Sequence, residues 1–160
     1  MIAIIDITTK NEYIYLEGIL EIENLSFPSP WSIQFFKEEI KNPITSLWAL
    51  MANEALSGYI CFWMFDSEIQ LINIAVHPYK RGQGLGHYLI TELIESGFSK
   101  GINSIWLEVR PSNLAARKLY QNLGFEEMSR KARYYRDTGE DAITMTLALS
   151  QKESYPLASN

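Results

Sequence analysis

The residues best suited to bind a charged ligand form a glycine-rich turn, Arg81-Gly82-Gln83-Gly84-Leu85-Gly86. An apolar run ending in Ile74-Ala75-Val76 precedes the turn, and Pro78 ends that predicted strand because it disfavours helical geometry at His77 and cannot donate to a ladder. The turn opens a predicted helix, whose apolar residues at helical spacing are Leu85, Tyr88, Leu89, Leu93 and Ile94. Glycines let a ligand approach the backbone, and N–H groups at a helix N-terminus attract anions. The pattern predicts a phosphate-binding turn.

The spacing of these glycines does not identify the ligand by itself. A dinucleotide-binding fingerprint needs a third glycine three residues after the second, and a P-loop ends in Gly-Lys followed by Ser or Thr. The segment Gly82-x-Gly84-x-Gly86 has neither feature. An ordinary loop with flexible glycines is the alternative interpretation.

Glu108 is the second candidate functional residue, a possible general base, and it lies in a strand predicted over residues 104–109. Side chains alternate along a strand, so Glu108 shares a face with Trp106 while three apolar residues take the other face. A carboxylate in an apolar central strand is costly unless it is paired or used, and desolvation would raise its pKa towards the range of a general base. The structural alternative is an ion pair with Arg110 or Arg117.

The elements that must position these residues alternate between strands and helices. A strand over residues 2–7 precedes a helix that Asn11 can cap and a second helix, 33–41, that Ser32 can cap. Turns then separate three antiparallel strands, predicted over residues 46–52, 55–65 and 68–76. The long helix ends at Gly101, and the strand 104–109 runs parallel to the strand before it. Asn113 caps the next helix, which Gly124 ends, and residues 126–135 and 141–149 form a final hairpin.

Three motifs follow one another in the second half of the chain. They are Arg81-x-x-Gly84-x-Gly86, then Trp106-Leu107-Glu108-Val109-Arg110-x-Ser112-Asn113, and last Ala116-x-x-x-Tyr120-x-x-x-Gly124-Phe125. Together they resemble the GNAT family of acetyl-CoA-dependent N-acetyltransferases. Within that family the chain is most similar to the RimI type, which acetylates the N-terminal alanine of a small-subunit ribosomal protein. The marks of that type are Pro30-Trp31-Ser32, Tyr134-Tyr135 and Glu140-Asp141-Ala142-Ile143.

The resemblance implies an α+β fold, the mixed α/β sandwich of the GNAT acyl-CoA N-acyltransferases. Its central seven-stranded sheet is mostly antiparallel, contains one parallel pair formed by the fourth and fifth strands, and is flanked by four helices. The resemblance also implies that Phe27, Trp31 and Phe35 line the acceptor groove, although aromatic packing between helices is the better explanation of each one taken singly. Residues 1–150 are predicted to form a single domain, and the polar segment 151–160 a disordered tail.

The resemblance further assigns roles to individual residues. Glu108 would be the catalytic base, and Tyr120 the acid that protonates the coenzyme A thiolate, although a core tyrosine would be expected without the resemblance. The amides of Ile74 and Val76 would bind the pantetheine arm and polarise the acetyl carbonyl if their strand separates from its parallel neighbour. Asn113 would touch the cofactor as well as cap its helix. The full set of predicted cofactor-binding residues is Ile74, Ala75, Val76, Arg81, Gly82, Gln83, Gly84, Leu85, Gly86, His87 and Asn113.

The composition of the chain limits the number of domains and argues against disulfide-rich, metal-binding and membrane-spanning proteins. The 160 residues are 47% hydrophobic, which suits one domain with a substantial core. The single cysteine, Cys61, excludes an internal disulfide framework and a cysteine-cluster metal site, and its apolar neighbours predict a buried thiol. The two histidines, His77 and His87, do not have a spacing typical of metal ligands, so we predict no metal. No apolar run reaches the length of a membrane helix, and the predicted location is the cytoplasm.

Charge indicates the partners. The net charge of −5 argues against nucleic-acid binding in general, but the charge is unevenly distributed. Residues 1–70 carry −7 (three lysines, ten acids) and residues 71–140 carry +3 (ten basic residues, seven acids). The basic part suits a polyphosphate such as coenzyme A, and the acidic part suits a basic protein, although both are also compatible with solvated surfaces. The function that the resemblance implies is direct transfer of the acetyl group of acetyl-CoA to a protein N-terminus, specifically the N-terminal alanine of a small-subunit ribosomal protein, without nucleic acid or membrane partners. The alternatives are acetylation of a lysine or a small amine, and coenzyme A binding without turnover.

Overall fold

The structure is a computed structural model that describes residues 1–149; the predicted tail, residues 151–160, lies outside the described part. The elements follow the chain in the order β1 (Ile2–Asp6), α1 (Glu12–Ser26), α2 (Ile33–Lys41), β2 (Thr45–Ala52), β3 (Ala55–Phe65), β4 (Glu68–Val76), the 3₁₀ helix η1 (Pro78–Lys80), α3 (Leu85–Ser99), β5 (Ser104–Val109), α4 (Leu114–Asn122), β6 (Glu126–Lys131) and β7 (Ala142–Ala148). The strands form one seven-stranded sheet in the order β1-β2-β3-β4-β5-β7-β6. The β4–β5 pair is parallel, whereas β1–β2, β2–β3, β5–β7 and β6–β7 are antiparallel. The predicted mixed sheet with four α-helices is confirmed.

The chain divides into two compact units, and we describe each by itself. The first unit comprises Met1–Met64 and Ile72–Leu89, and the second comprises Phe65–Leu71 and the described residues from Ile90 onward. Three elements contribute residues to both units: β4, α3 and β3, whose last residue, Phe65, belongs to the second unit.

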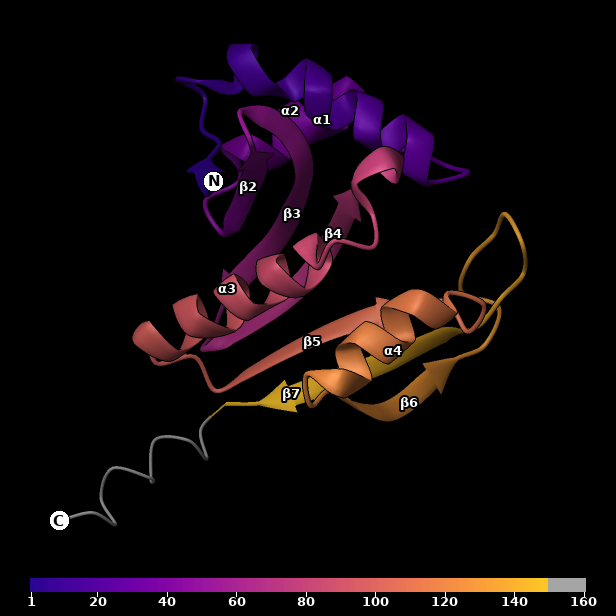
Figure 1. Ribbon diagram of the computed structural model, residues 1–160. Coiled ribbons are helices and arrows are strands. Elements are labelled where there is room, and N and C mark those ends of the chain that lie inside the picture. Colours follow the sequence, from indigo (N-terminus) through magenta and orange to yellow (C-terminus); the bar gives the residue numbers. More distant parts are fainter. Residues whose placement is uncertain (150–160) are drawn as a thin grey trace, which may run out of the picture. The chain divides into compact units, whose positions relative to one another are not determined.

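The first unit is organised around a hydrophobic cluster between its helices and strands. The cluster takes Leu16, Ile19 and Ile22 from α1 and Phe36 from α2. These side chains meet alternate residues of β2 and β3, which are Leu47, Ala49, Tyr59 and Cys61. Cys61 is fully buried, as predicted, and burial raises the pKa of its thiol well above the ordinary value. The helices α1 and α2 therefore cover one face of this part of the sheet (Figure 1).

The second unit places α4 over strands β5 and β7 (Figure 1). Along β5 the residues Ile105, Leu107 and Val109 are buried, and the residues between them are only partly buried, which confirms the predicted alternation. Gly124 ends α4 with a φ of +100°, a conformation that favours glycine. The next residue, Phe125, is buried and packs against Tyr120 with 5.7 Å between ring centroids.

Two local predictions were wrong. Asn11 precedes α1 but does not cap it, because its side chain accepts the Thr8 N–H and donates to the carbonyl of Asp6. The strand predicted over residues 126–135 ends at Lys131. Beyond it Arg133 has a φ of +51°, and its N–H is donated to the Asp141 carboxylate, so the chain leaves the ladder early.

Candidate functional site

The glycine-rich turn belongs to the first unit and has the geometry that an anion-binding turn needs. Gly82 and Gly84 have φ values of +79° and +82°, which residues with a Cβ rarely adopt. A Cβ added at either position would meet no protein atom within 4 Å, so the space beside both is open to a ligand. Helix α3 begins at Leu85, directly after the turn, and the first N–H groups of a helix have no intrahelical acceptors. The turn therefore presents backbone N–H groups and open space, which suits a phosphate group.

The end of β4 presents its last backbone amides away from β3. The His77 N–H is donated to the Ser57 carbonyl of β3 at 2.8 Å. Successive N–H groups of a strand point to opposite edges, so the amides of Ile74 and Val76 face the other way. In residues 1–149 the parallel pairing with β5 covers four residue pairs, from Glu68 with Ser104 to Leu71 with Leu107, and does not include these two amides. Their orientation fits the role that the resemblance assigns to them.

Arg81 is exposed, but its side chain is hydrogen-bonded to other residues of the first unit. Its Nε donates to the Val76 carbonyl at 2.9 Å, and its Nη2 donates to Ser26 Oγ at 3.0 Å. His77 caps η1, because its Nδ1 accepts the Tyr79 N–H at 3.2 Å. These bonds tie the turn to the end of β4 and to the end of α1. The Arg81 side chain therefore orders the turn, while its backbone remains part of the predicted cofactor site.

In the second unit Glu108 is mostly buried and paired. Its side chain is 12% exposed, and its Oε2 lies 2.5 Å from Nζ of Lys131, the last residue of β6. Neither predicted arginine is its partner: Arg110 pairs with Asp137 at 2.9 Å, and Arg117 donates to the Pro111 carbonyl. The sequence analysis did not identify Lys131. Only the β6–β7 register brings it close to Glu108.

Tyr134 and Tyr135 lie beside Glu108, in the segment between β6 and β7. A hydrogen bond to the Glu108 carboxylate raises the pKa of the Tyr134 hydroxyl. Burial, with the nearby charge of Glu108, raises the pKa of Tyr135 to about 12. The guanidinium of Arg110 lies 4.0 Å from the centroid of the Tyr135 ring, a cation–π contact. This part of the site therefore contains one carboxylate and two tyrosines that stay protonated at neutral pH.

The same segment is fixed by a small polar network. Arg110 donates from Nη1 and Nη2 to the two carboxylate oxygens of Asp137, at 3.0 and 2.9 Å. The Ser112 N–H is donated to Glu140 at 3.1 Å. Arg110 directly follows β5 and Ser112 lies two residues further on, so these bonds hold the segment against the end of the strand that carries Glu108.

Tyr120 is buried in the second unit, with 5% of its surface exposed. Burial, and then the neighbouring Tyr135, raises the pKa of its hydroxyl above the ordinary value of 10. The hydroxyl therefore stays protonated at neutral pH, but burial makes it a weaker acid than an ordinary tyrosine, so the shift in its pKa does not itself support proton donation to a thiolate. Asn113 caps α4 as predicted, because its Oδ1 accepts the Ala116 N–H at 3.2 Å.

The sequence analysis also missed a buried carboxylate in the first unit. Glu23, on α1, is 1% exposed and accepts hydrogen bonds from the Tyr59 hydroxyl, from Asn73 Nδ2 at 2.8 Å and from the Trp31 N–H at 2.8 Å. The sequence did contain a signal for this burial, because Glu23 lies on the same face of α1 as the apolar residues Leu16 and Ile19. The bond to Trp31 fixes the segment between α1 and α2.

The aromatic residues predicted to line the acceptor groove also pack within the first unit. Trp31 packs against Phe35 and Phe36, with 4.5 Å and 5.1 Å between the ring centroids. Phe27 and Trp31 are partly buried against the core cluster, whereas Phe35 remains 42% exposed. Packing against the core accounts for Phe27 and Trp31. A role in acceptor binding remains a prediction for Phe27, Trp31 and Phe35.

The predicted site residues fall into both units. Residues 74–76 and 81–87 belong to the first unit, and Glu108, Asn113 and Tyr120 belong to the second. Over residues 1–149 we find no group of three or more His, Cys, Asp or Glu side chains that could hold a metal ion. Among the helices of the same residues, none has the length and hydropathy needed to cross a membrane.

Comparisons with known proteins give one consistent result. Residues 16–125 match the model of the acetyltransferase (GNAT) family. The [ribosomal protein bS18]-alanine N-acetyltransferase of Escherichia coli K12 is 36% identical over 137 residues, which cover 84% of this chain and 92% of that protein. The protein of the same description from Haemophilus influenzae is 35% identical over 136 residues, covering 83% of this chain and 92% of that protein.

Solved structures agree with the sequence matches. The crystal structure of the ribosomal-protein-S18-alanine N-acetyltransferase from E. coli superposes with a TM-score of 0.84 at 34% identity, covering 93% of this chain and 94% of that one. Ard1 from Thermoplasma volcanium has the same fold, with a TM-score of 0.82 at 21% identity, covering 92% of this chain and 97% of that one. The matched range 16–125 covers more than half of the chain, and the chain therefore belongs to the GNAT family of acetyltransferases, which use acetyl-CoA.

Proposed function

We propose that this protein transfers the acetyl group of acetyl-CoA directly to the N-terminal alanine of ribosomal protein bS18. The proposal takes its acceptor from the similar enzymes of E. coli and H. influenzae. The observation that carries it is the mostly buried Glu108 carboxylate, 12% exposed and already paired with a primary amine. A cytoplasmic location and a reaction without a metal are parts of the same proposal.

Each residue has a defined task in this reaction. The Glu108 carboxylate accepts the proton that the attacking amine loses, either directly or through a water molecule. The amides of Ile74 and Val76 donate hydrogen bonds to the acetyl carbonyl, where negative charge develops as the C–N bond forms. The Tyr120 hydroxyl gives its proton to the sulfur when the C–S bond breaks. The turn formed by residues 81–87 holds the phosphates of acetyl-CoA.

Proton chemistry favours an α-amine over a lysine as acceptor. An α-amine with a pKa of about 7.8 is neutral in roughly one molecule in seven at pH 7, and a lysine of pKa about 10.4 in roughly one in 2,500. The difference corresponds to about 3.5 kcal/mol of proton removal. One carboxylate is sufficient for the α-amine and less suited to the lysine.

The test of the acceptor class uses two peptides. Both begin with alanine and contain one internal lysine, and one of them has a chemically blocked N-terminus. We expect acetylation of the free peptide only, measured by mass spectrometry with mapping of the modified residue. Acetylation of the internal lysine in both peptides would assign a lysine acceptor, and tight acetyl-CoA binding without any product would favour a small amine or a binding module.

Gly84 provides a test of the cofactor site. We expect Gly84→Val to weaken acetyl-CoA binding by at least tenfold, because the new side chain would fill the open space beside the turn. Isothermal calorimetry with acetyl-CoA gives the affinity directly. Gly101→Val is a matched control, since Gly101 also has a positive φ, +71°, and open space around it, but it ends α3. Equal losses of affinity in the two variants would remove the turn from the site.

A further inference from the structure

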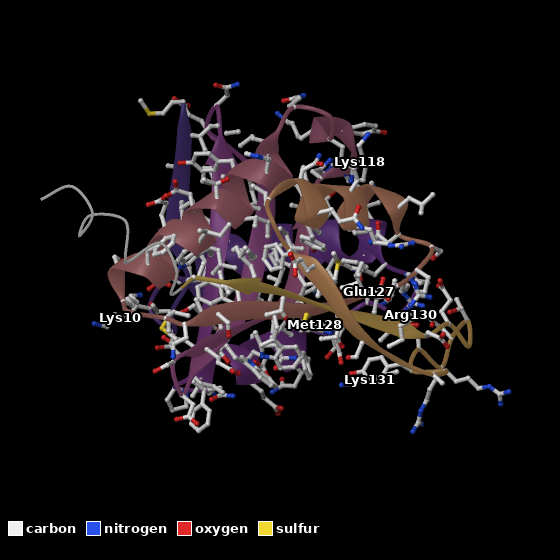
Figure 2. All side chains as sticks on the ribbon, turned by 90° about the horizontal axis from the view of Figure 1, so that it is seen from below. Lys10, Lys118, Glu127, Met128, Arg130 and Lys131 are labelled. Carbon is white, nitrogen blue, oxygen red and sulfur yellow. The ribbon has the colours of Figure 1, made fainter. Side chains whose placement is uncertain are left out.

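Lys131 is the last residue of β6, the exposed strand at the edge of the sheet, and its side chain lies on the same sheet face as that of Glu108. Glu108 of β5 lies opposite Thr144 of β7, and Thr144 lies opposite Ser129 of β6. Side chains two residues apart in a strand point to the same face, so Lys131 projects on the face of Ser129. Lys131 and its neighbour Arg130 both belong to β6 (Figure 2). The ammonium of Lys131 therefore reaches Glu108 across the sheet surface.

The groups around this ammonium form a cation site. Nζ lies 2.5 Å from Glu108 Oε2 and 5.3 Å from the centroid of the Tyr134 ring. Glu108 and the Tyr134 ring therefore flank the same ammonium, and the proximity of the carboxylate raises the pKa of the Tyr134 hydroxyl. A carboxylate with an adjacent ring face binds compact cations by ion pairing and by a cation–π contact. The group bound there is a primary ammonium, the same chemical group that a protein N-terminus carries.

A buried polar atom lies next to this site. Across residues 1–149, Thr144 Oγ1 is a buried side-chain oxygen without a hydrogen-bond partner. Thr144 is the cross-strand partner of Glu108, and the side chains of such a pair point to the same face within about 5.5 Å. Buried hydroxyls normally have a partner, so a ligand group or a water molecule at this position would satisfy Thr144.

We propose that the Lys131 ammonium is an internal occupant of the acceptor-amine subsite formed by Glu108, Tyr134 and Thr144, and that it must leave Glu108 before an acceptor can bind. This inference rests on the proposed function, because it assumes that Glu108 receives the acceptor amine. The ligand class is a primary amine at the end of a peptide. Lys131 then competes with the acceptor, whose apparent affinity falls in proportion to the fraction of enzyme in which Glu108 is free of Lys131.

Two observations fit an occupant that leaves easily and is not itself acetylated. The Lys131 side chain is 52% exposed, so its ammonium can move from Glu108 into solvent or be replaced by another cation. The hydrogen bond from Lys131 to Glu108 raises the pKa of the Lys131 ammonium, which keeps it protonated and unreactive as a nucleophile. An acceptor α-amine loses its proton far more readily.

The test replaces Lys131 with methionine, which has similar length and no charge. We expect Lys131→Met to lower the KM for an Ala-starting peptide about two- to fivefold at saturating acetyl-CoA, with kcat within twofold of wild type. Arg130→Met is the matched control, since it removes one positive charge from the adjacent residue, whose partner is the exposed Glu127. The control should leave the KM unchanged, so a fall in both variants would mean general electrostatics and overturn the proposal.

A second measurement does not depend on turnover. Calorimetry in the presence of coenzyme A gives the affinity for the free-amine peptide, and we expect Lys131→Met to bind it two- to fivefold more tightly but the N-blocked peptide no more tightly. An unchanged affinity, or a lower kcat at unchanged KM, would overturn the proposal and make Lys131 a residue that only positions Glu108. Acetyl-Lys131 found in wild-type protein incubated with acetyl-CoA would also overturn it. A wild-type protein that acetylates no peptide would instead contradict the proposed function.

Discussion

Replacing Glu108 with glutamine is expected to lower kcat by about 100- to 1,000-fold, the range typical for loss of a general base. Glutamine keeps the size of the side chain and an oxygen that can accept the Lys131 hydrogen bond, but it cannot take a proton from the amine. Glu108 is not among the residues predicted to bind the cofactor. We therefore expect the affinity for acetyl-CoA, measured by calorimetry, to stay within twofold of wild type.

The matched control for this variant is Glu127→Gln. Glu127 is an exposed carboxylate of β6 that pairs with Arg130 at 2.9 Å, so its replacement changes the net charge equally and leaves Glu108 intact. We expect its kcat to stay within twofold of wild type. A Glu108→Gln protein with wild-type kcat would show that another group, or solvent, accepts the proton.

Replacing Tyr120 with phenylalanine is expected to lower kcat by about 100-fold, because the thiolate then has no donor close to it. The ring still packs against Phe125, so the melting temperature should remain within a few degrees of wild type. The comparison is made by steady-state kinetics at saturating acetyl-CoA, with thermal unfolding in parallel. Tyr15→Phe, at a partly buried tyrosine that packs on the core of the first unit, is the control for loss of a hydroxyl.

The pH dependence gives a further check on Tyr120. Its pKa is raised by burial, so the hydroxyl keeps its proton throughout the neutral range and above the ordinary value of about 10. The kcat of wild type should therefore show no loss attributable to this acid below pH 10. Wild-type kcat in Tyr120→Phe would remove Tyr120 from the reaction.

Local chemistry in the sequence predicts much of the fold. Ser32 and Asn113 cap their helices as the side-chain types indicated, and Glu108 lies opposite the buried residues of its strand as the alternation indicated. These predictions succeed because each depends on residues that are close in sequence. Asn11 failed although it is local, since the backbone of Asp6 and Thr8 offered its amide alternative partners.

The partners of the two buried carboxylates could not be predicted in the same way. Lys131 reaches Glu108 only through the β6–β7 register, which contains an irregularity between Glu127 and Ser129. A shift of one residue moves every later side chain to the other face, and nothing local in the sequence determines that shift. Glu23 likewise meets Tyr59 and Asn73, which are 36 and 50 residues away. Such contacts are set by the sheet topology rather than by spacing along the chain.

The most direct test of the central claim is the acetylation of ribosomal protein bS18 itself. Purified bS18 with a free N-terminal alanine would be incubated with this protein and acetyl-CoA, and the modified position would be mapped by mass spectrometry. We expect one acetyl group, on the α-amine of that alanine, and none when Glu108→Gln replaces the wild-type protein over the same time. An acetyl group on a lysine of bS18, or no acetylation by an enzyme that binds acetyl-CoA, would contradict the claim.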